Sequence, residues 1–486
     1  MIFVAEITAA VDGSGTEETF YFSSGRGWAT TAADTPASTY ISNGLLPGGG
    51  YKREMFSGDG LFGAMRSAFG VLRINNADGA LDAWKDYGFD DRIIKVYMGA
   101  EEGLAYPSGY TLVFEARMLR AVISLRAVEL ILRDGLSALD KPICQTALLG
   151  TGDLEGPATL AGRLMPRQYG YSFIAPGVLV EPSKKIWLLC ENPCASTGQA
   201  AYNAGVAVTL GSHYASTATL LSTAPAAGQA RMYIGGPTYI RYETAPTSVQ
   251  VSLGEGYTID GSAATFGQMA QEAGIAGATG GVTSHDIYVD DDRTTYLQAM
   301  AREARARPSW FGFDRNMNFK AELIADPSGE SPVATITHWE ILSVERSTPG
   351  GFDVPAWKVT TRGRKNWAGV SNLSAAADDD LRQTYYKAET AEDSSILLKH
   401  PLAGTLAVDT GGFWIGGAAD FLALHKLDRD MLTVVAQMDA TNVTYDINDT
   451  VTFKHPRFGF GSGKKFLIVG IALDFASARI TWSLWG

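Results

Sequence analysis

The segment from Thr450 to Gly486 constrains the fold of this chain most, because it reads as three consecutive β-strands with no helix between them. We expect the strands at Thr450–Lys454, Phe466–Leu473 and Ala478–Leu484. A glycine-rich loop from His455 separates the first two strands, and a short turn separates the last two. Since the last strand ends where the chain ends, we expect the terminus to belong to the folded sheet, with Trp482 and Trp485 buried in it.

The composition favours the same class of structure for the rest of the chain. Its 486 residues are enough for about three or four domains, each able to bury a full core. Only 19% of the residues are charged, whereas 54 are glycines, as in turn-rich β proteins. The predicted fold class is therefore mainly β with a few helices (α+β), organised as several β-barrel or β-sandwich domains. The net charge of −12 argues against a protein that binds nucleic acid by neutralising phosphates.

Changes in local composition and residue pattern along the sequence predict four domains. Residues 1–145 form an N-terminal β domain, and residues 146–245 form a β-rich linking domain. Residues 246–345 form an α+β domain with two helices and a hairpin, and residues 346–486 form a C-terminal β-barrel domain with one helix. The run Leu112–Arg133 has no clean polar face in either period, and we interpret it as two long strands that meet near Ser124.

Signals within these domains place the remaining elements. We expect helices at Ala263–Ala273 (N-cap Ser262, stop at Gly274), from behind Asp292 to before Pro308, and at Ala418–Asp428. We expect strands at Ile2–Val11, Thr19–Ser23, Val178–Val180, Ile186–Leu189, Val206–Leu210, Arg231–Ile234 and Trp357–Thr361. Trp310–Phe313 and Phe319–Ile324 flank a five-residue turn and predict a hairpin. The Ala/Ser/Thr-rich residues 215–230 are expected to be an exposed loop.

No targeting or membrane segment is expected. The N-terminal residues carry no basic region, and Glu6 interrupts their apolar run, which does not fit a signal peptide. No uncharged apolar run reaches the ~18 residues of a membrane span.

The three cysteines, Cys144, Cys190 and Cys194, suit a reducing compartment and not a disulfide framework. With His213 they offer four possible metal ligands, but closed zinc and iron–sulfur sites usually use tighter pairs. Unpaired, part-buried thiols are the preferred interpretation, and whether the thiols hold a metal or iron–sulfur centre stays open. No metal site is assigned.

Other candidate sites have ordinary structural explanations. The Gly459–Lys465 loop has shorter spacing than a phosphate-binding loop and precedes a strand, so we interpret it as a hairpin loop. Asp290–Asp292 and Asp378–Asp380 lack the layout of a calcium loop. We assign the first to a helix cap and the second to a polar linker. No nucleophile elbow or Cys–His pair is present, so no catalytic residue and no cofactor are assigned.

Several motifs resemble hub proteins at the tail tip (baseplate) of long-tailed, siphovirus-like bacteriophages. They occur in order at Leu297–Met300, Trp310–Asn316, Ile336–Arg346, Trp357–Trp367, Asp449–Gly459 and Val469–Gly486. The stretch from Gly152 to Gly170 looks like the link used by related tail-tip chains. The likeness covers about half of the chain well and the N-terminal third loosely.

The resemblance implies a virion protein without catalysis, assembled in the host cytoplasm as a homotrimer around the tail axis. Each chain would supply two tail-tube-like barrels, so that three chains match a sixfold tube. The implied partners are a distal tail or tail tube protein, a tape measure protein, and a downstream fibre or central spike protein. DNA would only pass through the lumen during genome ejection, when the hub closes or opens the tube.

Three alternatives stay open. The chain is a sixfold distal tail ring protein of the same assembly, a host-carbohydrate-binding tail module, or a hydrolase without a recognisable signature. The carbohydrate alternative requires exposed aromatic side chains at loop tips, for which Trp28, Trp84 and Trp414 are the candidates.

Overall fold

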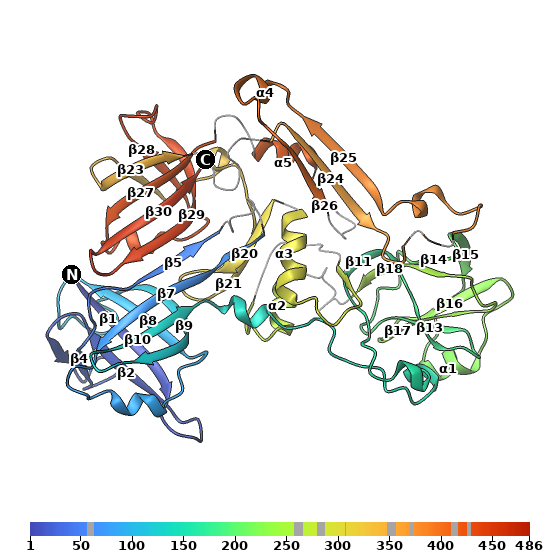
Figure 1. The fold of residues 1–486 in the computed structure, drawn as a ribbon, viewed down its shortest axis with the longest axis horizontal. Coiled ribbons are helices and arrows are strands. Elements are labelled where there is room, and N and C mark those ends of the chain that lie inside the picture. Colours follow the sequence, from blue (N-terminus) through green and yellow to red (C-terminus); the bar gives the residue numbers. More distant parts are fainter. Residues whose placement is uncertain are drawn as a thin grey trace.

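A computed structural model of the chain describes residues 1–55, 63–256, 266–278, 287–306, 308–347, 356–369, 371, 373–409, 417–424 and 429–486. In this part of the chain the strands form one 15-stranded sheet, one 9-stranded sheet and two 3-stranded sheets. Five short α-helices lie between the strands (Figure 1). The predicted fold class, mainly β with a few helices, is confirmed.

The N-terminal strands of the large sheet form a barrel-like unit, which we call the N-unit. Its strands are β1 (Ile2–Ala10), β2 (Glu17–Ser23), β3 (Gly27–Ala29), β4 (Tyr40–Asn43), β5 (Gly50–Glu54), β7 (Arg66–Asn75), β8 (Ile93–Gly99), β9 (Thr111–Ile123) and β10 (Ala127–Arg133). Leu45, two residues after β4, forms an isolated bridge with Ile74, so the chain passes from the β4 end of the N-unit to β7. The Leu112–Arg133 run is two paired strands with a tight turn at Ser124, as predicted.

The C-terminal strands form a second unit of the same sheet, which we call the C-unit. Its strands are β22 (Ala334–Thr337), β23 (Ile341–Ser347), β27 (Met431–Gln437), β28 (Thr450–Lys454), β29 (Lys464–Asp474) and β30 (Arg479–Trp485). The three predicted terminal strands are confirmed. Along β30, Ile480, Trp482 and Leu484 are buried and alternate with half-buried Thr481 and Ser483, the period of a strand with one face on a core.

The 9-stranded sheet forms a separate unit, shown in green on the right of Figure 1. Its strands are β11 (Arg167–Ala175), β12 (Val178–Glu181), β13 (Ile186–Cys190), β14 (Ala200–Asn203), β15 (Val206–Leu210), β16 (Gln229–Tyr233), β17 (Thr238–Tyr242), β18 (Val249–Gly256) and β19 (Ile287–Val289). Helix α1 (Thr217–Ser222) occupies part of residues 215–230, so the prediction of a plain loop there is wrong. Ser216 and Thr219 form a capping box that starts this helix.

In the ranges that the structure describes, two small sheets and four helices connect these units. The first sheet contains β21 (Phe319–Leu323), β20 (Ser309–Phe313) and β6 (Gly63–Ala64), and the second contains β25 (Tyr385–Glu392), β24 (Lys358–Lys365) and β26 (Thr405–Asp409). The helices are α2 (Phe266–Glu272), α3 (Tyr296–Ala306), α4 (Ser395–Lys399) and α5 (Ala418–Leu424). The predicted hairpin is β20–β21. In Figure 1, α3 stands at the centre of the molecule, between the C-unit and the 9-stranded sheet.

The predicted helix boundaries are partly corrected. Gly274, with a φ of 103°, follows the end of α2 as expected, whereas Ser262 lies outside the described residues. Asp292 is not the N-cap of α3. Thr295 takes that role, because its Oγ1 accepts from Gln298 N and the Gln298 side chain accepts from Thr295 N, both at 3.3 Å.

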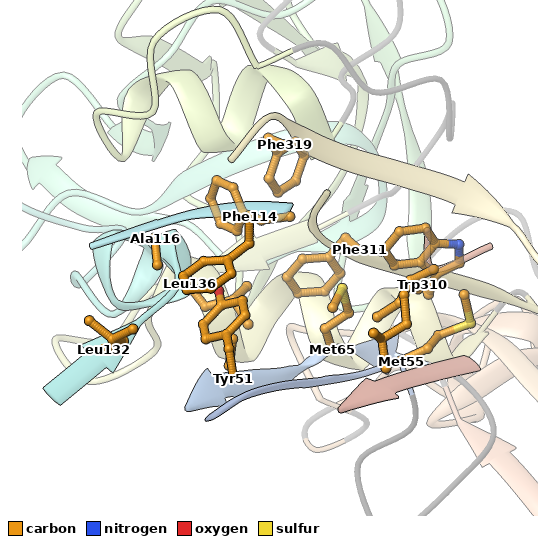
Figure 2. Packing of buried hydrophobic residues seen from close by; sticks show 14 of the residues in the cluster. Tyr51, Met55, Met65, Phe114, Ala116, Leu132, Leu136, Trp310, Phe311 and Phe319 are labelled. Carbon is orange, nitrogen blue, oxygen red and sulfur yellow. The ribbon is translucent and has the colours of Figure 1, made fainter. Parts of the chain in front are cut away.

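A large apolar core holds the N-unit, the C-unit and the β20–β21 hairpin together. Tyr51 of β5 stacks on Phe114 of β9 with ring centroids 4.3 Å apart, and Phe311 of β20 packs in the same cluster (Figure 2). Met55 and Met65 fill the space beside Phe311 and are both buried. The central hairpin is therefore part of the core that joins the two β units.

Strand pairing also crosses from 1–145 into 346–486, and β22 and β23, which precede residue 348, belong to the C-unit. The four domain boundaries expected from the sequence stay a prediction.

Candidate functional site: the charged seam between two β units

The N-unit and the C-unit share one continuous sheet through β5 and β29. These strands pair antiparallel from Gly470 opposite Glu54 to Asp474 opposite Gly50, while the other edge of β5 pairs with β7. The approach is close, because a Cβ added to Gly50 would lie 2.4 Å from Leu473 O, so glycine is required there. We call this line of contact the seam.

A buried ion pair lies across the seam. Arg53 of β5, with 5% of its side chain exposed, places Nη2 2.7 Å from Asp446 Oδ1, in the segment before β28. Its Nη1 also donates to Phe313 O at 3.4 Å, at the end of β20. The guanidinium thus contacts both the C-unit and the central hairpin from its position on the N-unit.

The hairpin turn completes this cluster through Arg315. Its backbone N–H donates to Asp446 Oδ2 at 2.7 Å. Its guanidinium donates to Leu112 O and to Val443 O, each at 3.0 Å. Two arginines and one aspartate therefore connect β5, β9, the hairpin and the C-unit with directional bonds.

Asp134 is a further buried acid on the N-unit side of the seam. Its Oδ2 accepts from Ala68 N at 2.7 Å, and its Oδ1 accepts from Leu136 N at 3.0 Å and Ser67 Oγ at 3.2 Å. Burial raises its pKa, although these hydrogen bonds and the nearby Arg53 lower it. With its oxygens occupied by backbone and hydroxyl donors, Asp134 has a structural role.

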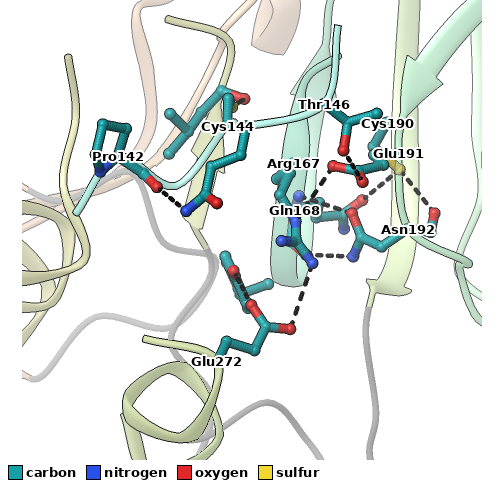
Figure 3. Close-up of polar contacts among 12 residues, drawn as sticks. Pro142, Cys144, Thr146, Arg167, Gln168, Cys190, Glu191, Asn192 and Glu272 are labelled. Carbon is teal, nitrogen blue, oxygen red and sulfur yellow. Dashed lines mark hydrogen bonds and ion pairs between the residues drawn. The ribbon is translucent and has the colours of Figure 1, made fainter. Parts of the chain in front are cut away.

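A second charged cluster joins the 9-stranded sheet to the helices, and we call it the Arg167 junction (Figure 3). Arg167 of β11 lies 3.3 Å from Glu272 Oε1, at the end of α2, and 3.7 Å from Glu191 Oε2, after β13. Tyr169 and Tyr296 both donate from their hydroxyls to Glu272. Burial and the Glu272 carboxylate raise the pKa of Tyr169, so its phenol stays a donor.

The structure does not assemble the four possible metal ligands considered from the sequence. Cys190 and Cys194 come together, whereas the Cys144 thiol donates to Val289 O at 3.3 Å, and His213 Nε2 lies 2.8 Å from Gln199 Oε1. Within the described ranges, no group of three or more His, Cys, Asp or Glu side chains is arranged to hold a metal ion.

The two acidic runs also have local structural roles. Asp291 accepts from the N–H groups of Arg293 and Thr294 ahead of α3, and Asp378 caps a 3₁₀ turn at Asp379–Arg382. The Gly459–Lys465 run links the antiparallel strands β28 and β29, as the hairpin interpretation predicted, and its two lysines are the first residues of β29.

Two of the three tryptophans proposed for carbohydrate contact are not exposed as that alternative requires. Trp84 is buried, with 3% exposed, and Trp28 is half-buried and stacks on Tyr110. Trp414 lies outside the described residues. Sequence reasoning missed Trp339, which is 85% exposed after β22 and lies against the His338 ring at a centroid distance of 4.2 Å.

A hollow of about 310 Å³ adjoins Trp339 at one end of the C-unit. It is lined by Thr337, His338, Trp339, Lys454, His455, Pro456 and Gly461. The hollow combines aromatic faces with imidazole and ammonium donors, so it offers both stacking and hydrogen bonding.

Among the residues that the structure describes, no helix has the length and apolar character needed to cross a bilayer.

Comparisons with known proteins found matches only among solved structures. No protein-family model matches the chain, and no curated protein does. The chain is similar to the 43 kDa tail protein of prophage MuSo2 from Shewanella oneidensis, with 11% identity, 100% of this chain and 98% of that chain covered, and a TM-score of 0.41. It is similar to the tail protein from Neisseria meningitidis MC58, with 10% identity, 100% and 96% covered, and a TM-score of 0.42.

A prophage tail protein from Listeria monocytogenes EGD-e is also similar, with 9% identity, 100% and 94% covered, and a TM-score of 0.40. All three neighbours are tail proteins, in line with the resemblance noted in the sequence motifs. Because the TM-scores are below 0.5, this likeness by itself does not assign a function.

Proposed function

We propose that the chain is a structural hub of a phage tail tip, which assembles as a homotrimer and joins the tail tube or distal tail ring to distal fibres. The observation that carries this proposal is the seam, where two β units of one chain share a continuous sheet through β5 and β29. A single chain thus presents two β units in a fixed relation to each other.

Two β units in one chain allow a threefold assembly to match a sixfold tube. Three chains with two β units each would present six β units around an axis, and a sixfold tube requires contacts that repeat at equal angles. The buried Arg53–Asp446 pair at the seam fixes the relation between the two units within each chain. The hub therefore works through repeated contact and not through a reacting group.

The proposed partners follow from this position. A distal tail or tail tube protein would contact one face of the ring, a tape measure protein the lumen, and a fibre or central spike protein the distal face. The net charge of −12 suits a lumen through which DNA passes without adhering during ejection. Three free, buried cysteines suit assembly in the host cytoplasm before incorporation into the virion.

Native mass measurement tests the assembly. A hub gives a particle of three times the 51.9 kDa chain mass, and a distal tail ring gives six times that mass. Images of intact particles should then place the chain at the tail tip with threefold order. A monomer in solution, or particles that lack the chain, would contradict the proposal, and cell-wall zymography with clear zones would contradict the absence of catalysis.

Carbohydrate binding at the Trp339 hollow is the second candidate function. An exposed indole face stacks on sugar rings, and His338, His455 and Lys454 surround it with polar groups. We expect purified chain to bind host surface glycans on an array, and Trp339→Ala to abolish that binding. Leu125→Ala, at an 89% exposed side chain of the N-unit, is the matched control and should bind as the unaltered chain does. Equal binding by both variants, or none by the unaltered chain, removes this candidate.

A further inference from the structure

Two of the three thiols lie next to each other inside the 9-stranded unit. Cys190 ends β13 and Cys194 lies four residues later, and their sulfur atoms are 3.6 Å apart. The exposed fractions of the two residues are 0% and 7%.

The surroundings of the two sulfurs make them chemically unequal. The Cys190 thiol and the Thr238 hydroxyl, 3.4 Å from Cys194 Sγ, lower the pKa of Cys194. Burial raises the pKa of Cys190. Because the Thr238 hydroxyl donates toward Cys194 Sγ and stabilises a thiolate there, we assign the first attack to Cys194, with the Cys190 sulfur 3.6 Å away.

The surroundings of Cys190 and Cys194 fit a disulfide between the two sulfurs better than a bound metal ion. The other polar atoms near them are oxygens of neutral groups, such as Gln168 Oε1 at 3.5 Å from Cys194 Sγ. Among the described residues, no third His, Cys, Asp or Glu side chain joins them in a metal-binding group. Two thiolates with neutral oxygens do not form a closed zinc site.

We propose that Cys190 and Cys194 form an intrachain disulfide when the chain meets a low-molecular-weight disulfide, the kind of oxidant present outside a reducing cytoplasm. The Cys194 thiolate attacks the small disulfide and releases one small thiolate. The Cys190 thiolate then attacks the Cys194 sulfur and releases the second. One sulfur–sulfur bond breaks and one forms, two electrons pass to the oxidant, and two protons end on the released thiols.

The bond would fasten the segment that holds the Arg167 junction. Glu191 pairs with Arg167 and accepts from Thr146 Oγ1 at 2.7 Å. Asn192 Oδ1 accepts from Gln168 N at 3.0 Å, next to Arg167 on β11 (Figure 3). Both residues lie inside the ring that a 190–194 disulfide closes, so oxidation would limit the motion of the groups that position β11.

The test uses the full chain incubated with oxidised glutathione, then unfolded and alkylated with iodoacetamide. Because both sulfurs are buried, attack requires local opening, and we expect reaction over minutes to hours. We expect one alkylated thiol in place of three, a mass about 2 Da lower before alkylation, and a mapped peptide that links Cys190 to Cys194. Three alkylated thiols after exposure, or a bridge that includes Cys144, would overturn the proposal.

Variants separate the pair from the third thiol. Cys144→Ser should form the same bridge at the same rate, whereas Cys190→Ser should stop at a mixed disulfide on Cys194. If Cys190→Ser does not fold, the peptide map of the unaltered chain still decides. Oxidation should slow amide exchange in β11 and β13 roughly tenfold, reversed by reductant, and unchanged exchange would overturn the fastening of the junction. Retention of added zinc that blocks oxidation would overturn the preference for a disulfide.

Discussion

Replacing Asp446 with alanine should separate the two β units locally without unfolding either of them. The substitution leaves Arg53, 5% exposed, without its carboxylate at 2.7 Å. It also removes the acceptors of the Arg315 N–H and the Ile447 N–H, both at 2.7 Å. Each of these groups would then lie in the core without its present partner.

The size of the effect follows from burial. Removing one partner of a buried ion pair costs about 3–5 kcal/mol. Because 17% of the Asp446 side chain is exposed, water partly replaces it, and we take the lower end, about 3 kcal/mol of opening free energy. Lys52→Ala is the matched control on the same strand. Its ion pair with Glu54 involves a side chain that is 53% exposed, so its loss should cost less than about 1 kcal/mol.

Hydrogen exchange measured by mass spectrometry on peptides from β5 and β29 gives the assay. Global unfolding of a multidomain chain does not report one equilibrium, whereas amide exchange reports local opening. A loss of 3 kcal/mol should speed exchange roughly 100-fold in these two strands, with β1 and β2 little changed. Equal exchange in Asp446→Ala and Lys52→Ala, or faster exchange spread evenly over the N-unit, would refute the reasoning.

Three other perturbations test the remaining structure. Deleting Ile480–Gly486 removes several side chains that are at most 1% exposed, at roughly 1.5–3 kcal/mol each, so soluble folded chain, and with it the proposed trimer, should be lost, and a normally folded chain on size exclusion would contradict this. Glu272→Gln removes the negative charge opposite Arg167 and should cost about 1–3 kcal/mol of junction stability, read as faster amide exchange in β11 and α2, whereas unchanged exchange speaks against the junction. The Ser477 hydroxyl lowers the pKa of Asp474 below its unfolded value near 4. Asp474→Asn should therefore destabilise the chain by the same amount from about pH 5 to 8, and this loss of stability should fade as the pH drops below about 4. A loss of stability that grows on acidification would contradict the lowered pKa.

Elements with a strong local signal could be predicted from the sequence. Of the terminal strands, β28 and β30 alternate apolar and polar residues and β29 is a continuous apolar run, and Trp482 and Trp485 are buried as expected. The Leu112–Arg133 run fits neither period cleanly, but its interpretation as two strands that pair as a hairpin identifies β9 and β10. Local pattern sufficed wherever a strand pairs with its neighbour along the chain.

The seam could not be predicted from the sequence, because its signal is not local. β5 is short, begins with glycine and alternates Tyr51 and Arg53 with exposed or half-buried residues, so no apolar run marks it as a central strand. Its partner β29 lies at the other end of the chain, and only the folded structure brings Arg53 to Asp446. Trp339 was missed for a related reason, because the exposure of a tryptophan side chain depends on whether other parts of the fold cover its loop, which its local sequence does not show.

The seam and the Arg167 junction use the same physical arrangement. In each, a largely buried arginine contacts groups from separate elements of the fold, at Asp446 and Phe313 for Arg53, and at Glu272 and Glu191 for Arg167. Apolar side chains of similar size would stabilise such contacts about as well, but they impose no direction. Hydrogen bonds to a planar guanidinium do impose direction, and they fix the angle between the elements that they join. In a ring of copies an angular error repeats at every contact, so fixed angles matter more to the proposed hub than added stability.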